Sequence, residues 1–259
     1  MWFKLGPKGL GSDARVWTAS CIDQNPGYDV QFLTDESAAG FVNESFAHRP
    51  DIVDTYNALT VPILKADLLR YLLLYAEGGV WFDLDASCEG IPIDDWIPPE
   101  LEERADLVVG WEFDAGYRFQ FRQFTTWAVL SRRGVSHLMA VVDDIVDAVH
   151  EAARAHNTTV SMLDKNMVGD VVDFTGPIRF AQSVMKSIDR STNMAYKWDD
   201  YHGLLEPKLA GNILILPGYS FAASCNTYEP RDQHRIRPPL VEHHYAGTWK
   251  NDYGGERIE

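Results

Sequence analysis

The chain has 259 residues, of which 46% are hydrophobic and 24% are charged, and its formal net charge is −15 at pH 7. This composition suits a soluble globular protein with one sizeable domain, and the acidic balance argues against nucleic acid and anionic membranes as partners. The sequence has no apolar run long enough to cross a bilayer, and its start lacks the pattern of a secretory signal. A cytoplasmic protein is therefore expected if this start is genuine, and membrane association only through an anchor outside this chain.

The predicted elements alternate between strands and helices along the chain. Short apolar runs rich in branched and aromatic residues predict strands, and longer runs with helical periodicity predict helices. The strands are expected at 28–33, 80–85, 105–113, 124–132 and 212–217. The helices are expected at 34–46, 50–59, 62–79, 135–156 and 175–188. The alternation predicts an α/β fold with ligands at the carboxyl ends of its strands, followed by a loop-rich part over 200–259.

Two aspartates follow a leucine-rich helix and its Gly78-Gly79 turn. Asp83 and Asp85 lie two apart in the expected strand, so both side chains leave the same face. Carboxylates this close repel one another unless a cation lies beside them, and hard oxygen ligands suit Mn²⁺ or Mg²⁺, which also bind diphosphates. The pair predicts a metal site at a strand end, whereas the plainer interpretation is an Asp-x-Asp in a solvated loop.

The preceding helix carries a second pair of charged residues. Asp67 and Arg70 are three apart, so they share one face of the helix. One interpretation is an ordinary ion pair within the helix. The other places both side chains in the same cleft as the two aspartates, where the planar fork of Arg70 binds a phosphate or a sugar hydroxyl.

Two adjacent histidines near the C-terminus are candidates for a further metal ligand. Neighbouring residues in a strand face opposite ways, so only one of His243 and His244 can point into the site. A neutral imidazole completes a metal sphere made otherwise of carboxylate, phosphate and water oxygens. Two surface or core histidines are the equally simple alternative.

Two other features limit the interpretation. Phosphotransferases of the haloacid dehalogenase type also place an Asp-x-Asp at a strand end, and residues 169–173 loosely imitate their later acidic motif. That class opens with its motif, however, whereas here the motif follows two or three helices.

The cysteines, Cys21, Cys88 and Cys225, are too few for a zinc cage and leave room for one disulfide and one free thiol.

The segment KADLLRYLLLYAEGGVWFDLD, residues 65–85, resembles the signature of glycosyltransferase family 32. That signature reads roughly S/A-D-x-x-R-Y-x-x-L-x-x-x-G-G-x-Y-x-D-x-D. The similarity extends upstream to residues 25–37 and downstream to HHYAGTW, and the downstream stretches are most similar to the fungal initiation-specific α-1,6-mannosyltransferase branch.

The resemblance implies a GT-A type, Rossmann-like nucleotide-sugar-binding fold with a mixed central sheet, and a GDP-mannose donor held through Mn²⁺ or Mg²⁺. It makes Asp85 the direct metal ligand and places Asp83 nearer the ribose and the sugar. Asp67 and Arg70 correspond to the residues that contact the donor sugar. His244 is the better match for the C-terminal metal ligand, with His243 as its alternative, and Trp249 fits the aromatic residue that closes over the diphosphate.

The sequence departs from the family pattern in two places. The family opens with a strand of the type I-P-K-x-I-H-Q-x-W, of which only Met1-Trp2 is recognisable, so the first strand is expected to be missing from this single domain of residues 1–259. Position 81 carries Trp where Tyr is common, which keeps a large aromatic side chain and loses its hydroxyl.

The expected function is a metal-dependent, retaining hexosyltransferase that moves mannose from GDP-mannose to a glycan acceptor, in the Golgi by family resemblance. A front-face displacement is the default mechanism, since no residue stands out as a covalent nucleophile. The alternatives are an inositol phosphoceramide mannosyl- or galactosyltransferase, and an inactive relative that binds nucleotide sugars without turnover. The sequence does not identify the acceptor or the oligomeric state.

Overall fold

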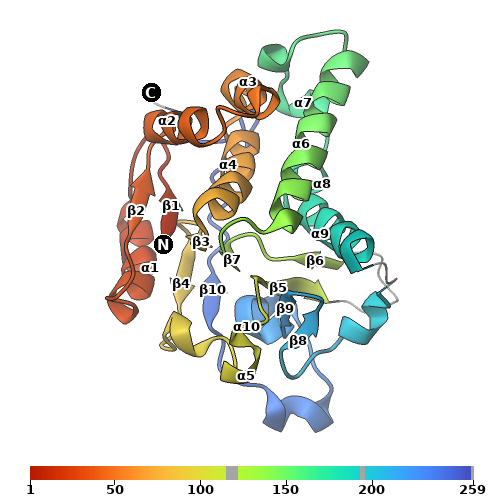
Figure 1. Cartoon of the computed structure of the whole chain (residues 1–259). Coiled ribbons are helices and arrows are strands. Elements are labelled where there is room, and N and C mark those ends of the chain that lie inside the picture. Colours follow the sequence, from red (N-terminus) through yellow and green to blue (C-terminus); the bar gives the residue numbers. More distant parts are fainter. Residues whose placement is uncertain (115–121, 193–195, 258–259) are drawn as a thin grey trace.

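The computed structural model describes residues 1–114, 122–192 and 196–257, and it forms a central β-sheet covered by helices (Figure 1). The strands are β1 (Trp2–Lys4), β2 (Gln31–Leu33), β3 (Gly79–Phe82), β4 (Ala86–Cys88), β5 (Leu107–Asp114), β6 (Arg122–Phe124), β7 (Ala128–Ser131), β8 (Lys208–Ala210), β9 (Ile213–Leu216) and β10 (Val241–His243). The α-helices are α1 (Ser12–Gln24), α2 (Asp35–Ser45), α3 (Pro50–Ala58), α4 (Pro62–Glu77), α5 (Pro99–Glu102), α6 (Ser136–Ala155), α7 (Lys165–Val168), α8 (Val171–Phe174), α9 (Pro177–Thr192) and α10 (Gly218–Ala222). Short 3₁₀ helices lie at Ile93–Asp95, Val160–Met162, Trp198–Tyr201, Ala223–Cys225 and Pro230–Arg235.

The main sheet is mixed and has the strand order β2-β1-β3-β7-β5-β9-β8, with β6 added alongside β5. Strand β1 pairs in parallel with both β2 and β3, and β5 pairs in parallel with β9. Strand β7 is antiparallel to its two neighbours, β3 and β5. Strands β2, β1, β3 and β5 therefore run in the same direction, and their carboxyl ends lie at one edge of the sheet, where α/β proteins bind ligands.

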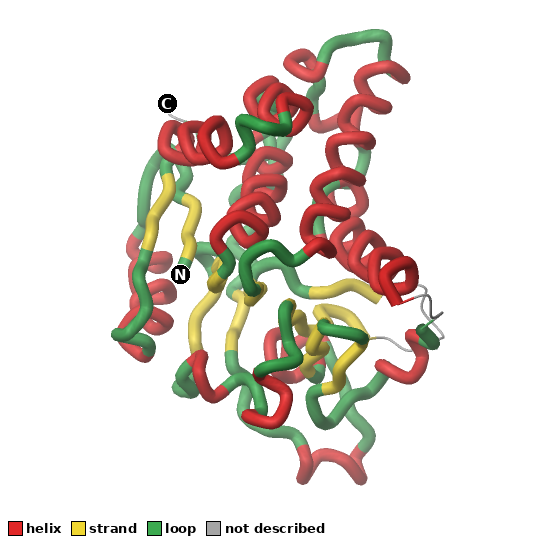
Figure 2. Tube along the Cα trace, in the orientation of Figure 1, coloured by secondary structure: helices red, strands yellow, loops and turns green. Residues whose placement is uncertain are grey.

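Helices cover both faces of this sheet, and each face has its own apolar core. Alternate residues of the central strands enter opposite cores, as the side-chain period of two requires, so Trp81 lies in one and Phe82 in the other. The first core is completed by α2, α3, α4, α6 and α9, which form the upper layer in Figures 1 and 2. The second is completed by α1, α10 and the small β4–β10 sheet. Burial on both faces explains the continuous apolar runs of the central strands.

The helix before the two aspartates is buried and ends in a turn that requires glycine. Nine of the sixteen residues of α4 are buried, which agrees with leucines on more than one face. Gly78 then adopts φ 69°, and a Cβ there would lie 2.8 Å from the backbone nitrogen of Arg133. Both the left-handed backbone and the close approach of the chain exclude a larger residue, so Gly78 fixes the entry into β3.

The predicted elements are largely confirmed, but the strand expected over 124–132 is divided between β6 and β7, and there are three further differences. Strand β1, which was not among the predicted strands, lies between β2 and β3. Helix α1 was not predicted, because it buries only Thr18 and Cys21 and so lacks an apolar stripe. The strand expected over 80–85 ends at Phe82, and the aspartates lie in the turn that leads to β4.

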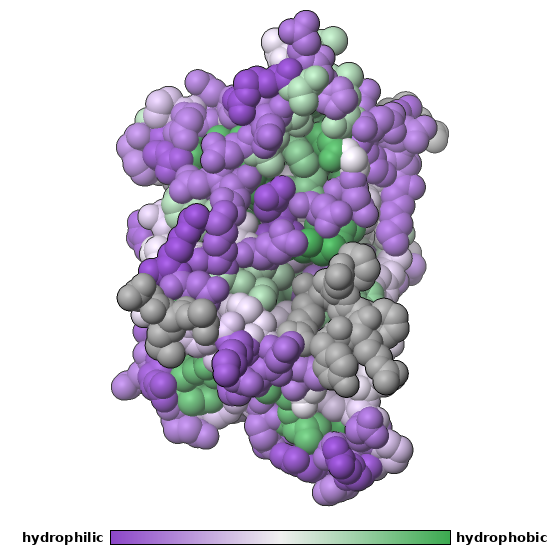
Figure 3. Space-filling model, turned by 90° about the vertical axis from the view of Figure 1, so that its right-hand side faces the viewer, coloured by the Kyte–Doolittle hydropathy of each residue, from purple (hydrophilic) through white to green (hydrophobic). Residues whose placement is uncertain are grey.

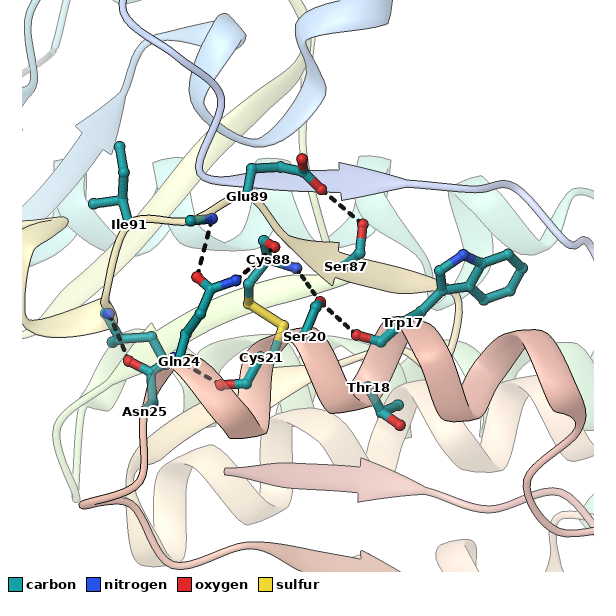
Figure 4. The surroundings of a disulfide bond; sticks show 12 residues. Trp17, Thr18, Ser20, Cys21, Gln24, Asn25, Ser87, Cys88, Glu89 and Ile91 are labelled. Atoms are coloured by element: carbon teal, nitrogen blue, oxygen red, sulfur yellow. Dashed lines mark hydrogen bonds between the residues drawn. A yellow bond between two sulfur atoms is a disulfide. The ribbon is translucent and has the colours of Figure 1, made fainter.

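A disulfide between Cys21 and Cys88 joins α1 to β4, and Cys225 is a free thiol (Figure 4). Side chains of α1 also form hydrogen bonds with backbone groups of this strand. The Ser20 hydroxyl accepts from the N–H of Cys88 at 2.8 Å, and the Gln24 amide donates to its carbonyl at 3.0 Å. The sequence left the pairing of the three cysteines open. The structure thus anchors α1 to the strand that directly follows the two aspartates.

The surface that faces right in Figure 1 is mainly polar, with apolar side chains in several separate areas (Figure 3). Among the helices that the structure describes, none combines the length and the apolar character that crossing a membrane requires.

Candidate active site

A cleft of about 1600 Å³ opens at the carboxyl ends of β1, β3 and β5. Its walls come from segments far apart in the sequence, including the start of α1, the first half of α4, the turn after β3 and residues 243–257. Among the described residues, seven carboxyl side chains and five lysine or arginine side chains line it. The carboxyl groups belong to Asp13, Asp35, Asp67, Asp83, Asp85, Glu112 and Glu256, and the basic groups to Lys4, Lys65, Arg70, Lys250 and Arg257. This excess of negative charge attracts cations and disfavours a diphosphate that arrives without one.

Arg70 connects the helix to the first aspartate. Its guanidinium donates to Asp67 Oδ1 at 2.7 Å and to Asp83 Oδ1 at 3.0 Å, and Asp67 Oδ2 accepts from the Thr175 hydroxyl at 2.7 Å. Both Asp67 and Arg70 are 3% exposed. The predicted placement in one cleft is therefore correct, and the ion pair within the helix exists as part of the same cluster.

The charged groups of this cluster stabilise one another in their ionised forms. Burial opposes the charge of Arg70, but Asp83 and Asp67 outweigh burial and raise the pKa of its guanidinium. Burial raises the pKa of Asp67 against the opposing effects of Arg70 and Thr175. Because charged groups this deeply buried are stable only when paired, removal of one partner leaves the others in an unfavourable environment.

Trp81 supplies a second donor to Asp83. Its indole N–H donates to Asp83 Oδ1 at 2.7 Å, and its ring lies 5.2 Å from the Arg70 guanidinium carbon. The hydroxyl lost through Trp at this position is thus replaced by an N–H that fixes the aspartate. One oxygen of Asp83 is engaged by Arg70 and Trp81.

Asp85 is held by the C-terminal segment of the chain. Its Oδ2 accepts from the backbone N–H of Ala246 at 2.9 Å, and its Oδ1 lies 3.2 Å from His243 Nε2. Burial alone would raise the pKa of Asp85, but His243 and the N–H of Ala246 outweigh it and lower that pKa. Asp85 therefore keeps its negative charge, as a metal ligand must.

The structure selects His243 in place of His244 as the partner of the carboxylates. His243 stacks on Trp127 with ring centroids 4.1 Å apart, which aims its Nε2 at Asp85. His244 turns away, stacks on Trp17 and forms a 2.8 Å hydrogen bond with Ser87. The preference for His244 came from its match to the family pattern, and neighbouring side chains of a strand face opposite ways, so a match displaced by one residue selects the wrong side chain.

Asp83, Asp85 and His243 fit a divalent cation. One ligand atom of each lies within 4.8 Å of those of the other two. Two carboxylates and an imidazole suit Mn²⁺ and, with more water ligands, Mg²⁺. His243 Nδ1 is buried without a hydrogen-bond partner in the described part of the chain, so this ring is not saturated by the protein.

Trp249 also lines the cleft, where it is half-buried. Lys165 donates to its carbonyl at 3.3 Å, and the Lys165 ammonium lies 5.2 Å from the centroid of its ring. The predicted position at the cleft therefore agrees with the structure, while its contact with a diphosphate stays a prediction.

Sequence reasoning missed two residues of the cleft, Glu112 and Tyr245. Glu112 is 7% exposed, and burial raises its pKa to about 7 against the effects of Gln123, His243 and Lys250. Tyr245 adopts φ 50° and contacts the edge of His243 at 4.2 Å between ring centroids. The available signal for Glu112 was its position within the apolar run VVGWEF. Charged residues are rarely buried, so one in such a run indicates a functional or paired group.

Comparison with known families places this site in context. Residues 12–102 match the family described as the glycosyltransferase sugar-binding region containing the DXD motif. This part of the chain is similar to that family, and Asp83-Leu84-Asp85 is a DXD sequence within the matched residues.

The chain is 30% identical over 259 residues to an initiation-specific alpha-1,6-mannosyltransferase of Candida albicans, an alignment that covers 89% of this chain and 65% of that protein. It thus spans less than two thirds of the length of that relative. A mannosyl phosphorylinositol ceramide synthase of Saccharomyces cerevisiae is 41% identical over 69 residues, covering 27% of this chain and 17% of that protein. Among solved structures, the PaToxG glycosyltransferase superimposes with a TM-score of 0.49 at 13% identity, over 74% of this chain and 70% of that one.

Proposed function

We propose that this chain carries the active site of a metal-dependent mannosyltransferase that transfers mannose from GDP-mannose to a glycan. The observation that carries the proposal is the cluster of Asp83, Asp85 and His243 beside the buried Asp67–Arg70 pair. The similarity to an α-1,6-mannosyltransferase over most of this chain supports mannose as the transferred sugar.

The charge of the cleft supports the need for a divalent cation. A nucleoside diphosphate is anionic, and the carboxylates that line the cleft outnumber its basic side chains. When bound by Asp83, Asp85 and His243, Mn²⁺ or Mg²⁺ neutralises the charge that develops on the departing diphosphate. The protein contributes ligands that are already fixed: Asp85 by Ala246 and His243 by its stacking on Trp127.

The remaining residues bind and orient the donor in this proposal. Hydrogen bonds to Asp67 and Asp83 hold the Arg70 side chain in place. Arg70 therefore contacts the sugar without further loss of side-chain entropy. Trp249 covers the diphosphate. In a front-face reaction the acceptor hydroxyl forms its bond to the anomeric carbon on the side from which GDP leaves. The bond to the β-phosphate oxygen breaks, and that oxygen takes the hydroxyl proton, so the α configuration is retained.

The disulfide supports an oxidising compartment as the site of folding. Cys21 and Cys88 are joined in the structure, and such bonds persist in secreted and lumenal proteins and are rare in the cytosol. This bond supports a lumenal compartment of the secretory pathway for the proposed function, and the Golgi is the compartment that the family resemblance implies.

A second acceptor class is favoured by one specific observation. The short segment that aligns with the mannosyl phosphorylinositol ceramide synthase has a higher sequence identity to that protein than the whole chain has to the α-1,6-mannosyltransferase. Inositol phosphoceramide is thus the alternative acceptor, and the same donor and metal apply to both.

The test is release of nucleotide from GDP-mannose, GDP-fucose, UDP-glucose and UDP-galactose, with Mn²⁺ or with EDTA. The parent protein and Asp85→Ala are compared, and Glu242→Ala, at the exposed position of β10, serves as the matched carboxylate control. Mn²⁺-dependent release from GDP-mannose alone, lost in Asp85→Ala and kept in the control, is expected. Nucleotide release from a UDP-sugar would contradict the proposal that GDP-mannose is the donor. Silence of a folded protein with every donor would favour an inactive nucleotide-sugar-binding relative.

A further inference from the structure

A β-bulge in β5 brings two consecutive side chains into the cleft. Trp111 pairs with Phe124 and Phe113 pairs with Gln123, so the register shifts at Glu112. In a regular strand, successive side chains point to opposite faces, whereas a bulge re-aims them. Glu112 and Phe113 accordingly both line the cleft.

Glu112 has binding capacity that the protein does not use. Its side chain is hydrogen-bonded to Gln123, and its Oε2 is buried without a partner within the described residues. Burying a carboxyl oxygen without a hydrogen-bond partner costs free energy, unless a ligand or water donates a hydrogen bond to it. The group lies in a cleft open to ligands, so an incoming hydroxyl can supply the missing donor.

Two aromatic side chains line the same cleft as this carboxyl group. Phe113 is 39% exposed and Tyr245 is 41% exposed, and both line the cleft. Tyr245 is fixed by the Cys225 thiol, which lies 2.8 Å from its hydroxyl, and by the ring of His243. A carboxylate and partly exposed aromatic rings in one cleft offer a sugar both hydrogen-bond acceptors for its hydroxyls and apolar faces for its C–H groups.

The position in the sheet separates these residues from the donor cluster. Arg70 and Asp83 belong to α4 and the end of β3, and β7 lies between β3 and β5. Two strand spacings amount to about 10 Å. Through Tyr245, which contacts His243, this group adjoins the metal-binding residues in the same cleft.

We propose that Glu112, Phe113 and Tyr245 form the acceptor subsite, in which Glu112 accepts a hydrogen bond from a hydroxyl of an acceptor hexose and the two aromatic rings contact its apolar face. The inference rests on the proposed mannosyltransferase function and names the residues that select the acceptor. A sugar hydroxyl of the donor is the other source of the same chemistry, and the assay separates the two.

The kinetic test uses Glu112→Gln, which keeps the shape of the side chain, and Phe113→Ala. Their controls are Glu242→Gln and Met162→Ala, at exposed positions outside the cleft. GDP release from GDP-mannose and Mn²⁺ is measured with and without methyl α-mannopyranoside as the acceptor. The ratio of transfer to hydrolysis is expected to fall about ten- to a hundredfold in Glu112→Gln and about three- to tenfold in Phe113→Ala. The controls keep the ratio of the parent. Equal loss of both rates would assign Glu112 to the donor sugar, and an unchanged ratio would reject the subsite.

A binding measurement keeps the two proposals separable. Saturation-transfer NMR with methyl α-mannopyranoside is expected to detect binding to the parent and to both controls, and to lose it in Glu112→Gln and Phe113→Ala. Binding without any turnover of GDP-mannose would reject the proposed function and retain the sugar subsite. Turnover without acceptor binding, or binding that survives both substitutions, would reject the subsite and retain the function.

Discussion

Glu112→Gln is expected to stabilise the protein at pH 8 and to leave its stability nearly unchanged at pH 4.5. Burial raises the pKa of Glu112 from 4.5 to about 7. Between these values the native state keeps a proton that the unfolded chain has released, so stability falls as the pH rises through this window. At about 1.4 kcal/mol for each pH unit, the parent loses about 3 kcal/mol, and glutamine, which does not ionise, loses none. Because Glu112 is only 7% exposed, solvent screening does not reduce this figure.

Urea unfolding in EDTA, followed by tryptophan fluorescence at both pH values, measures this difference. Glu242→Gln, at an exposed position, serves as the control and is expected to show no pH-dependent gain. A gain of about 3 kcal/mol at pH 8 corresponds to a rise in melting temperature of about 5 °C for a chain of this length. The same gain at both pH values would mean that packing and not ionisation is responsible. No gain at pH 8 would refute the burial of an unpaired carboxylate.

Three further predictions concern the site and its support. Arg70→Leu leaves Asp67 buried without its cation, and we expect a loss of about 3–5 kcal/mol in the same urea experiment; an unchanged midpoint would contradict this role. His243→Ala is expected to weaken Mn²⁺ binding at least about tenfold by electron paramagnetic resonance, and His244→Ala to preserve it; the reverse order would restore the choice made from sequence. Reduction of the Cys21–Cys88 bond, which spans a sequence separation of 67, is expected to cost about 4 kcal/mol, measured with and without dithiothreitol and against the Cys21→Ser/Cys88→Ser variant. If the double variant also responded to the reductant, another group would be involved.

The fold was predictable where periodicity and turn chemistry agree. The helix over α4, its Gly78 turn and the apolar strand that follows were all recognised, because burial on both faces leaves a continuous apolar pattern. Helix α1 and strand β1 were missed for the opposite reason. α1 is held largely by a disulfide and by side-chain bonds to β4, and β1 has only three residues, so neither produces a periodic signal.

The site was predictable to the extent that its residues are close in sequence. Asp67, Arg70, Asp83 and Asp85 fall within one short segment, and the structure brings them to one cleft. The choice between the two histidines depended on the direction of a distant strand, β10, which pairs with β4 in a register that spacing does not reveal. Glu112 enters the cleft through a bulge, and a bulge depends on the pairing of two strands and not on either sequence alone.

The two aspartates of the motif differ in the parts of the chain to which they are bound. Asp83 is fixed by Arg70 and Trp81, which are both buried, so its position is set by the interior of the protein. Asp85 instead accepts backbone hydrogen bonds from His244 at its carbonyl and from Ala246 at its side chain, and it contacts His243. The position of Asp85 and that of residues 243–246 are therefore mutually dependent. Trp249 follows this segment within a few residues, so the contacts of Asp85 also support the segment that carries Trp249 to the cleft. The Asp85 side of the site is thus expected to depend on the order of the C-terminal segment, while the Arg70 side depends on the core.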